Sequence, residues 1–205
     1  MRHLRIWYSF GAGRYHMGMT KAFYFIQNRK QTQEELEQQF NGFKAVMQEY
    51  FIEDLKIYHG RGLGWFPVFS EELVWQAENL DEDLLKEMGN HFQANVIALS
   101  VLDDDVVFLV VCKDGAVRKF VCAGEGMIED FGFDEEFSTE FPDILCQCGF
   151  DGDSLRRVWS LDNYYESDLL YDMLDEMKTF PVFEPDEETP DGIIVIGGET
   201  ISDGE

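Results

Sequence analysis

The stretch that most constrains the fold is the run from Asn95 to Cys122. It contains three β-rich segments, separated by two short acidic turns at residues 103–105 and 114–115. An Asp-Gly pair between two such segments favours a two-residue hairpin, because a type I′ turn needs a positive φ at both central positions. The sequence therefore predicts an antiparallel meander over residues 95–122.

The second turn also predicts the register of the hairpin. The pairs are Lys113 with Ala116, Val111 with Arg118, Leu109 with Phe120 and Val107 with Cys122. One face then carries Val107, Leu109, Val111, Phe120 and Cys122, and the other carries Val106, Phe108, Val110, Cys112, Val117 and Val121. Because both faces are apolar, we expect an α+β fold in which a mixed or antiparallel sheet has helices packed on both faces.

The clearest helix signal begins at Thr32. Thr32 and Glu35 form a capping box, in which each side chain can bond the backbone of the other residue. An apolar stripe at helical spacing follows to about Phe51, and it predicts core packing: Leu36, Phe40, Phe43, Val46, Met47, Tyr50 and Phe51. Strands are predicted nearby at Leu4–Phe10, Ala22–Ile26 and Leu55–Tyr58.

The C-terminal half is acidic. Residues 138–148 predict a short helix, and residues 162–178 predict an acidic amphipathic helix whose apolar stripe is Tyr165, Leu169, Leu170, Met173 and Met177. Residues 181–192 are rich in proline and acid, and residues 193–196 are a candidate last strand. We expect a single α+β domain over residues 1–180 and an acidic Pro- and Gly-rich tail over residues 181–205.

Net charge narrows the class of partner. The 205 residues contain 16 Lys and Arg against 41 Asp and Glu, which gives a formal charge of −25. The excess lies after residue 65, because residues 1–65 hold nine basic and six acidic side chains. A field of this size argues against nucleic acid or anionic lipid and favours a cationic protein, although acid can also serve only to keep a protein in solution.

Localisation follows from what the chain lacks. No apolar run is long enough to span a membrane, and the N-terminus has no secretory signal. Four cysteines are few for the length, and the hairpin register keeps Cys112 and Cys122 apart, so we expect reduced thiols in the cytoplasm.

No constellation of residues predicts catalysis. The four histidines are not at zinc-like spacing from a cysteine, and Cys146-Gln-Cys148 is not a redox or zinc motif. Asp103–Asp105 lacks a predictable fourth ligand, and the segment from Asp151 departs from a calcium loop at Arg156. We therefore expect no cofactor, no metal and no enzymatic activity.

One glycine-rich loop leaves an alternative open. His59-Gly-Arg-Gly-Leu-Gly64 is the only such loop with a basic residue, so Arg61 and the loop amides could hold a small anion. Its spacing fits neither a dinucleotide fingerprint nor a phosphate-binding P-loop. A flexible connection is the simpler interpretation, and a ligand-binding domain or enzyme using Gly60–Gly64 is the alternative function.

Two acidic stretches are candidate binding surfaces. The first lies within residues 125–143, and the second lies within residues 162–176, where tyrosines are interleaved with the acids. Carboxylates steer a basic partner, and desolvated aromatic side chains anchor it. The candidate partner-binding residues are Asp134, Glu135, Glu136, Asp168, Tyr171, Asp172 and Asp175.

The hairpin segment Ser100–Gly115 resembles one found in poorly characterised bacterial proteins. Together with the acidic composition, it is similar to the immunity proteins that neutralise toxins of bacterial competition systems. This resemblance covers about a tenth of the chain by motif. It implies a stoichiometric inhibitor that occludes the active site of a basic toxin, such as a nuclease.

Overall fold

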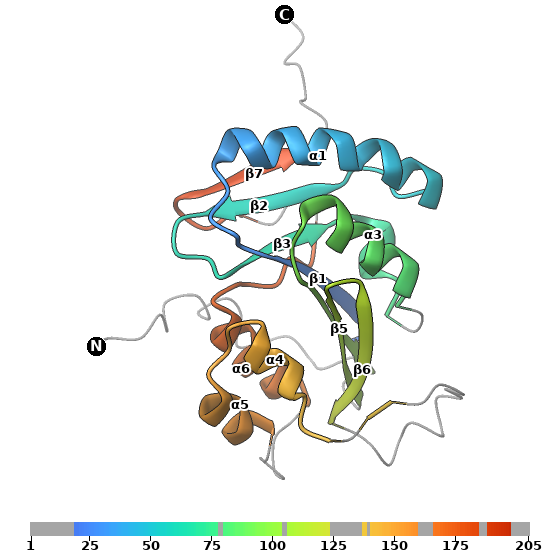
Figure 1. Cartoon of the computed structure of the whole chain (residues 1–205). Helices are drawn as coiled ribbons and strands as arrows, with labels where there is room; N and C mark the ends of the chain where they lie inside the picture. The colour runs from blue at the N-terminus through green and yellow to red at the C-terminus, as the bar shows by residue number, and fades with distance from the viewer. Residues whose placement is uncertain are drawn as a thin grey trace, which may run out of the picture.

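A seven-stranded antiparallel sheet forms the centre of the molecule (Figure 1). The computed structural model describes residues 19–77, 80–103, 106–123, 137–138, 140–159, 166–184 and 188–197. The strand order is β6-β5-β4-β1-β3-β2-β7. The strands are β1 (Lys21–Gln27), β2 (Lys56–Gly60), β3 (Trp65–Phe69), β4 (Val96–Leu102), β5 (Val106–Lys113), β6 (Ala116–Ala123) and β7 (Ile193–Gly197). The strand predicted at Leu4–Phe10 lies outside the described residues.

The predicted meander is confirmed, with one error of register. β4, β5 and β6 pair in sequence, and three of the four predicted hairpin pairs are present. The register shifts between Val107 and Phe108, so Val107 pairs with Ala123 and the predicted pair with Cys122 is wrong. A β-bulge of this kind adds one residue to a strand and leaves the pairs nearer the turn unchanged.

Strand β3 lies in the interior of the sheet although it contains a proline. Pro67 pairs with Phe25 of β1, whereas the β2–β3 ladder contains only the pairs of Lys56 with Phe69 and of Ile57 with Val68. The ladder with β2 therefore stops before Pro67, where the missing N–H would otherwise have left a carbonyl unpaired. The segment 59–64, predicted as a flexible connection, is the end of β2 and the turn that leads into β3, since His59 and Gly60 belong to β2.

Two helices cover one face of the sheet (Figure 1). The helix α1 (Gln33–Met47) begins at the predicted capping box, which is confirmed, and continues as a 3₁₀ turn, η1 (Gln48–Tyr50). The helix α3 (Glu82–Phe92) begins at the N-cap Asp81. They bury Leu36, Phe40, Phe43 and Met47 of α1 and Leu84, Leu85, Met88 and Phe92 of α3 in one core with the sheet. A short helix, α2 (Glu71–Val74), follows β3.

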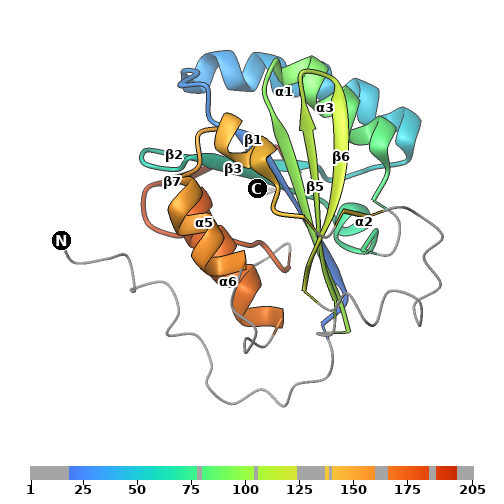
Figure 2. The same cartoon turned by 60° about the horizontal axis from the view of Figure 1, so that its bottom comes forward.

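Three helices cover the opposite face, so the prediction of helices on both faces is confirmed (Figure 2). They are α4 (Asp143–Gln147), α5 (Gly152–Trp159) and α6 (Glu166–Met177). Within α6 the buried residues are Leu169, Leu170, Met173, Leu174 and Met177, which includes all the described members of the predicted stripe. Both faces of β5 are buried between the two helical layers, as its apolar sequence predicts.

Candidate functional surfaces

The predicted C-terminal surface is only partly within the described residues. Asp134, Glu135 and Glu136 lie outside them. The side chain of Asp168 lies outside the description. The positions of Tyr171, Asp172 and Asp175 follow helical spacing, so they share the face of α6 opposite its buried stripe. Asp175 is exposed, while Tyr171 and Asp172 are half-buried.

A second acidic surface lies at the C-terminal end of α1. After η1, Phe51 adopts a left-handed backbone conformation with φ of 57°, which ends the helix. Its side chain is 86% exposed, so the prediction that it belongs to the core stripe is wrong. The exposed carboxylates Glu49, Glu53 and Asp54 flank it. We call residues 49–54, together with Asp81, Asp83 and Glu87 of α3, the acidic corner.

Carboxylates from both parts of this corner affect the pKa of Tyr50. The pKa of Tyr50 is raised by partial desolvation and then by four carboxylates, which are Glu87, Asp81, Asp83 and Glu49. A negative field disfavours the phenolate, which is the charged form of tyrosine. Carboxylates of α3 and of the segment after α1 thus act on the same side chain, which lies next to the exposed Phe51.

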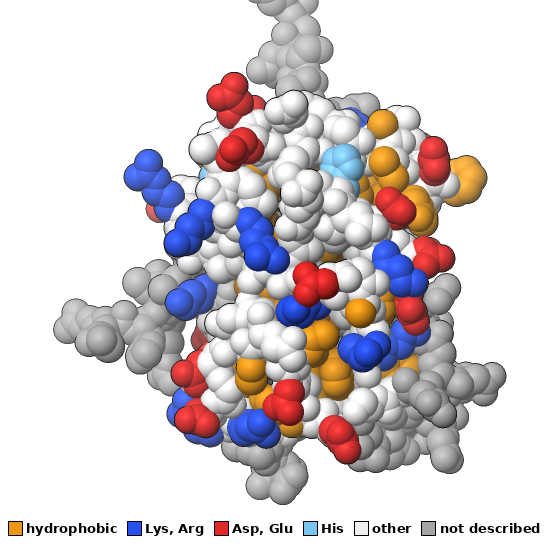
Figure 3. Space-filling model, in the orientation of Figure 1, with side chains coloured by type: hydrophobic (Ala, Val, Ile, Leu, Met, Phe, Trp, Pro, Cys, Tyr) orange, Lys and Arg blue, Asp and Glu red, His pale blue; other side chains and the backbone are white. Residues whose placement is uncertain are grey.

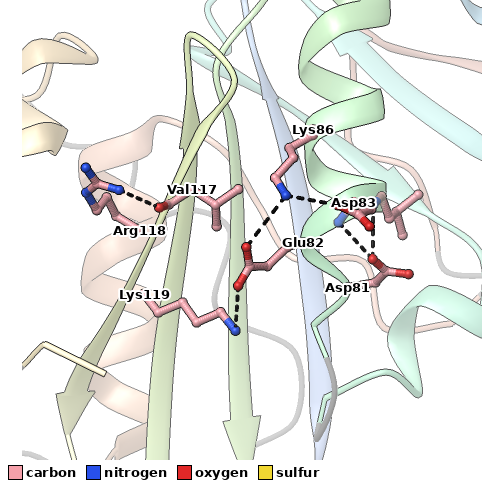
Figure 4. Close-up of polar contacts among 8 residues, drawn as sticks. Asp81, Glu82, Asp83, Lys86, Val117, Arg118 and Lys119 are labelled. Atoms are coloured by element: carbon pink, nitrogen blue, oxygen red, sulfur yellow. Dashed lines mark hydrogen bonds and ion pairs between the residues drawn. The ribbon is translucent and has the colours of Figure 1, made fainter. Parts of the chain in front are cut away.

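Ion pairs set the border of this corner on α3 (Figure 4). Glu82 accepts from Lys119 of β6 at 2.9 Å, and it lies 3.8 Å from Lys86. Lys86 also contacts Asp83 at 2.9 Å. Glu82 thus joins α3 to the sheet, and Lys86 pairs with both Glu82 and Asp83. The ion pairs of the described residues include neither Glu87 nor the carboxylates of residues 49–54.

Three segments that are far apart in sequence meet at the other end of the sheet. Asn28, which follows β1, donates its backbone N–H to the carbonyl of Gly64 at 2.9 Å and its amide Nδ2 to the carbonyl of Leu63 at 2.7 Å. The N–H of Gly64 donates to the carbonyl of Lys178 at 3.0 Å. These bonds hold the Arg29–Lys30 loop, the β2–β3 turn and the end of α6 together.

Basic side chains gather where these segments meet, on the side of the molecule where the β2–β3 hairpin ends (Figure 3). Arg29, Lys30, Arg61 and Lys178 are exposed, and among the described residues none of them forms an ion pair. We call these four residues the basic end. The pKa of Asp114 is lowered by its hydrogen bond to Lys113 and by the charges of Lys113 and Arg29, so the β5–β6 turn also lies close by.

The basic end includes Arg61, the residue singled out from the glycine-rich loop, but the loop residues do not all contribute. His59 belongs to β2, and its ring lies 5.1 Å from that of Phe66 in the core. Close packing against the backbone is enough to explain the glycine at position 64, because a Cβ there would lie 2.5 Å from the carbonyl oxygen of Met177. Arg61 is the exposed charged residue of this loop.

The cysteines and carboxylates do not form a metal centre within the described ranges. Among those residues, no three His, Cys, Asp or Glu side chains gather as metal ligands. Burial raises the pKa of Cys148 to about 11, and burial also raises the pKa values of Cys112 and Cys122, which disfavours the reactive thiolate in each. Asp103 closes the β4–β5 turn with φ of 52°, and the other two residues of that acidic turn lie outside the description.

No known protein family, curated protein or solved structure matches this chain. No helix in the described part of the chain is long and apolar enough to cross a membrane.

The sequence predicted neither the acidic corner nor the basic end, and the reasons differ. The acidic corner was hidden because Phe51 continues the apolar stripe of α1 by spacing, although Glu49, Glu53 and Asp54 around it were a usable signal of exposure. The basic end had no such local signal, since its residues come from positions 29–30, 61 and 178.

Proposed function

We propose that this chain is a stoichiometric protein-binding protein that binds a cationic partner through the acidic corner. The observation that supports this best is Phe51, a large apolar side chain that is 86% exposed among carboxylates. Phe51 does not contribute to the core, whereas aromatic side chains commonly anchor protein–protein interfaces. The net charge of −25 would add long-range steering of a basic partner.

The acidic face of α6 is the rival contact surface for the same partner. Its positions Asp172 and Asp175 share one face, but Tyr171, the aromatic residue there, is half-buried. A half-buried side chain has less apolar surface left to lose on binding than Phe51 has. We therefore place the anchor at the acidic corner and treat α6 as an additional source of steering charge.

The resemblance of Ser100–Gly115 to immunity proteins is consistent with this proposal, because immunity proteins also bind another protein. On that basis the partner would be a basic toxin, such as a nuclease, and the bound chain would occlude its active site. Most of Ser100–Gly115 lies in β4 and β5, which are buried, so this segment would support the fold rather than contact the toxin.

The first experiment is capture of the partner on immobilised protein from a lysate of the source organism at low salt, followed by elution with a salt gradient. The proposal expects one basic protein, bound with fixed stoichiometry and released only at high salt or by denaturant. Release of many unrelated basic proteins at modest salt would mean that the charge serves only to keep the chain in solution.

Variants then locate the surface. Phe51→Ala should weaken binding about 10- to 100-fold, which corresponds to the loss of a hot-spot side chain. The triple variant Glu49→Gln, Glu53→Gln and Asp54→Asn should mainly slow association and reduce its dependence on salt.

Two further variants serve as controls. Trp75 is also exposed, at 70%, but the ammonium of Lys21 lies 6.0 Å from its ring, so Trp75→Ala should leave binding of a cationic partner unchanged. Neutralising Asp168, Asp172 and Asp175 together tests the rival surface. Loss of binding in this variant alone would place the partner on α6, and unchanged binding in all the variants would contradict both sites.

The basic end supports a second candidate function, which is binding of a small anion. Here the specific observation is that Arg61 is joined by Arg29, Lys30 and Lys178, none of which is paired with a carboxylate within the described residues. Exposed lysine and arginine side chains on adjoining segments are typical of sites for phosphate or carboxylate groups, and an anion bound there would compete with Asp114 for the charge of Arg29.

Thermal unfolding in pyrophosphate against chloride at equal ionic strength tests this candidate. The wild-type protein should be stabilised by pyrophosphate, and Arg61→Ala should lose most of that stabilisation. Lys44 is exposed on α1, away from the three segments that form the basic end, so Lys44→Ala is a control for the loss of one positive charge. No stabilisation of the wild-type protein would remove the candidate.

A further inference from the structure

The two edges of the sheet differ in how they are protected against pairing with another strand. At the β6 edge, the backbone of Ser138 exchanges hydrogen bonds with Lys119 and Val121, both at 3.0 Å. β6 also carries two cationic side chains, Arg118 and Lys119, and its pairing with β5 contains a register shift. Covering segments, charges and bulges are the devices by which proteins prevent the association of sheet edges.

Among the described residues, β7 shows none of these devices. Within the described residues it pairs with β2 on one side only, and its pairing has no register shift. Its sequence is Ile-Ile-Val-Ile-Gly, without a charge or a proline, in a chain of which 28% is charged. Two of its apolar side chains remain exposed, Ile194 at 42% and Val195 at 38%.

The neighbouring strands also lack carboxylates. Residues 55–70, which contain β2 and β3, include Lys56 and Arg61 but no Asp or Glu. Strands β2 and β3 therefore place positive rather than negative charge beside β7, which lessens the repulsion that a second copy would meet from Glu188 and Asp191 just before the strand. A cationic protein would find no carboxylates on β2, β3 or β7 to attract it. The partner proposed for the acidic corner is therefore not expected to pair with β7.

We propose that β7 pairs with β7 of a second copy of this chain, antiparallel and about a two-fold axis at Val195. In this register Val195 faces Val195 of the other copy, and Ile194 faces Ile196 across the new pair. Apolar residues then lie opposite apolar residues on both faces, and the unpaired backbone groups of both edges form hydrogen bonds. The proposal is independent of the proposed function, because it uses a different surface and a different partner.

Salt should affect this association in the direction opposite to binding of a cationic protein. Two copies with a charge of −25 each repel at long range. Raising the ionic strength from about 0.01 M to about 1 M shortens the Debye length from about 30 Å to about 3 Å and screens this repulsion. Analytical ultracentrifugation should therefore show a dimer fraction that rises with salt, and a monomer at every salt concentration would overturn the proposal.

A charge in β7 should prevent the pairing. Val195→Lys places two ammonium groups opposite each other at the two-fold axis, so the dissociation constant should rise at least tenfold. Val195→Thr keeps a β-branched side chain and should retain the dimer. Circular dichroism confirms that each variant is folded, and a folded Val195→Lys protein that still forms the wild-type dimer would overturn the site.

Disulfide trapping tests the register and remains informative if Val195→Lys does not fold. In a Cys146→Ser background, which removes the exposed thiol, Val195→Cys should oxidise to a covalent dimer, since directly opposed residues have Cα atoms about 4.5–5.5 Å apart. In Ile194→Cys the two cysteines would lie about 8 Å apart, which is too far to bridge. Equal trapping of both variants, or of neither, would overturn the register.

Discussion

The two ends of the sheet carry charges of opposite sign and are assembled in different ways. The acidic corner is built mainly from one continuous segment, residues 49–54, to which α3 adds carboxylates. The basic end is built from three separate segments, which hydrogen bonds of Asn28 and Gly64 hold together. The helix α1 connects the two ends, since it begins just after Lys30 and ends just before Glu49.

Because the two ends are assembled differently, they should respond differently to mutation. The exposed side chains of Glu49, Phe51, Glu53 and Asp54 can be changed without disturbing the fold, because they lie outside the core. Ile52 is buried and Asp81 caps α3, so these two members of the corner are structural. At the basic end, charge and fold are coupled, because the bonds that bring the cations together also fasten β1, the β2–β3 hairpin and α6 to one another.

Two phenylalanines of the same apolar stripe should differ most. Phe43 is fully buried and its ring lies 5.0 Å from that of Phe92, so Phe43→Ala should lower the free energy of unfolding by about 3–5 kcal/mol. Phe51→Ala should change it by no more than about 0.5 kcal/mol. Urea unfolding measures both, and a large loss in Phe51→Ala would show that the acidic corner is structural.

The junction at the basic end should respond to loss of a single amide. Asn28 donates to the carbonyl of Leu63 and its Oδ1 accepts from the N–H of Lys30 at 2.7 Å. Asn28→Ala should therefore lower the free energy of unfolding by about 1–2 kcal/mol and also reduce any stabilisation by pyrophosphate. Asn41 is exposed on α1, so Asn41→Ala is the control. A stable Asn28→Ala protein with unchanged response would show that charge and fold are not coupled there.

Features that depend on neighbouring residues could be predicted from the sequence. The Asp114–Gly115 turn gave the register near it, and alternation assigned both faces of β5 correctly. The capping box at Thr32 gave the start of α1, and the stripe of α6 gave its buried face. In each case the physical cause lies within a few residues of the element that it determines.

Features that depend on distant contacts could not be predicted in this way. β3 was missed because a short apolar run with a proline does not favour a strand, and its place beside β1 is fixed by pairing with residues about forty positions away. The bulge at Val107 has no signal in the hairpin sequence. Phe51 is exposed because it adopts the left-handed conformation that ends the 3₁₀ turn. Helical spacing does not reveal this change of backbone conformation.

The start of α1, at the basic end, should show a smaller effect of about 1 kcal/mol. Thr32→Ala removes the hydroxyl that accepts from the N–H of Glu35 at 3.2 Å, whereas Thr32→Ser keeps it and is the control. Hydrogen bonds from the backbone and side chain of Thr32 also lower the pKa of Glu35. The stabilisation from Glu35 is thus present above its unfolded pKa of about 4.3 and is lost as the pH falls through the lower folded value.

Unfolding measured at pH 7 and at acid pH checks this prediction. The difference in stability between Thr32→Ser and Thr32→Ala should narrow in acid, because protonated Glu35 no longer attracts the Thr32 hydroxyl as a carboxylate does. A difference that stays constant with pH would show that only the bond from the hydroxyl to the Glu35 N–H matters.

The smallest effect is expected at Tyr50, where the field of the acidic corner acts on a titrating group. The pKa of Tyr50 is raised, first by desolvation and then by the carboxylates around it. Its contribution to stability is therefore complete below the unfolded pKa of about 10 and is lost as the pH rises through the higher folded value. The wild-type protein should thus lose more stability above pH 10 than Tyr50→Phe does.

Salt and one further variant separate the two causes of this shift. Because Glu87 exerts the largest charge effect on Tyr50, Glu87→Gln should reduce the difference between the two proteins, and so should high salt. Desolvation alone would leave the difference unchanged in both tests. That result would mean that α3 and residues 49–54 do not act as one negative surface, and the contrast between the two ends would then rest on the basic end alone.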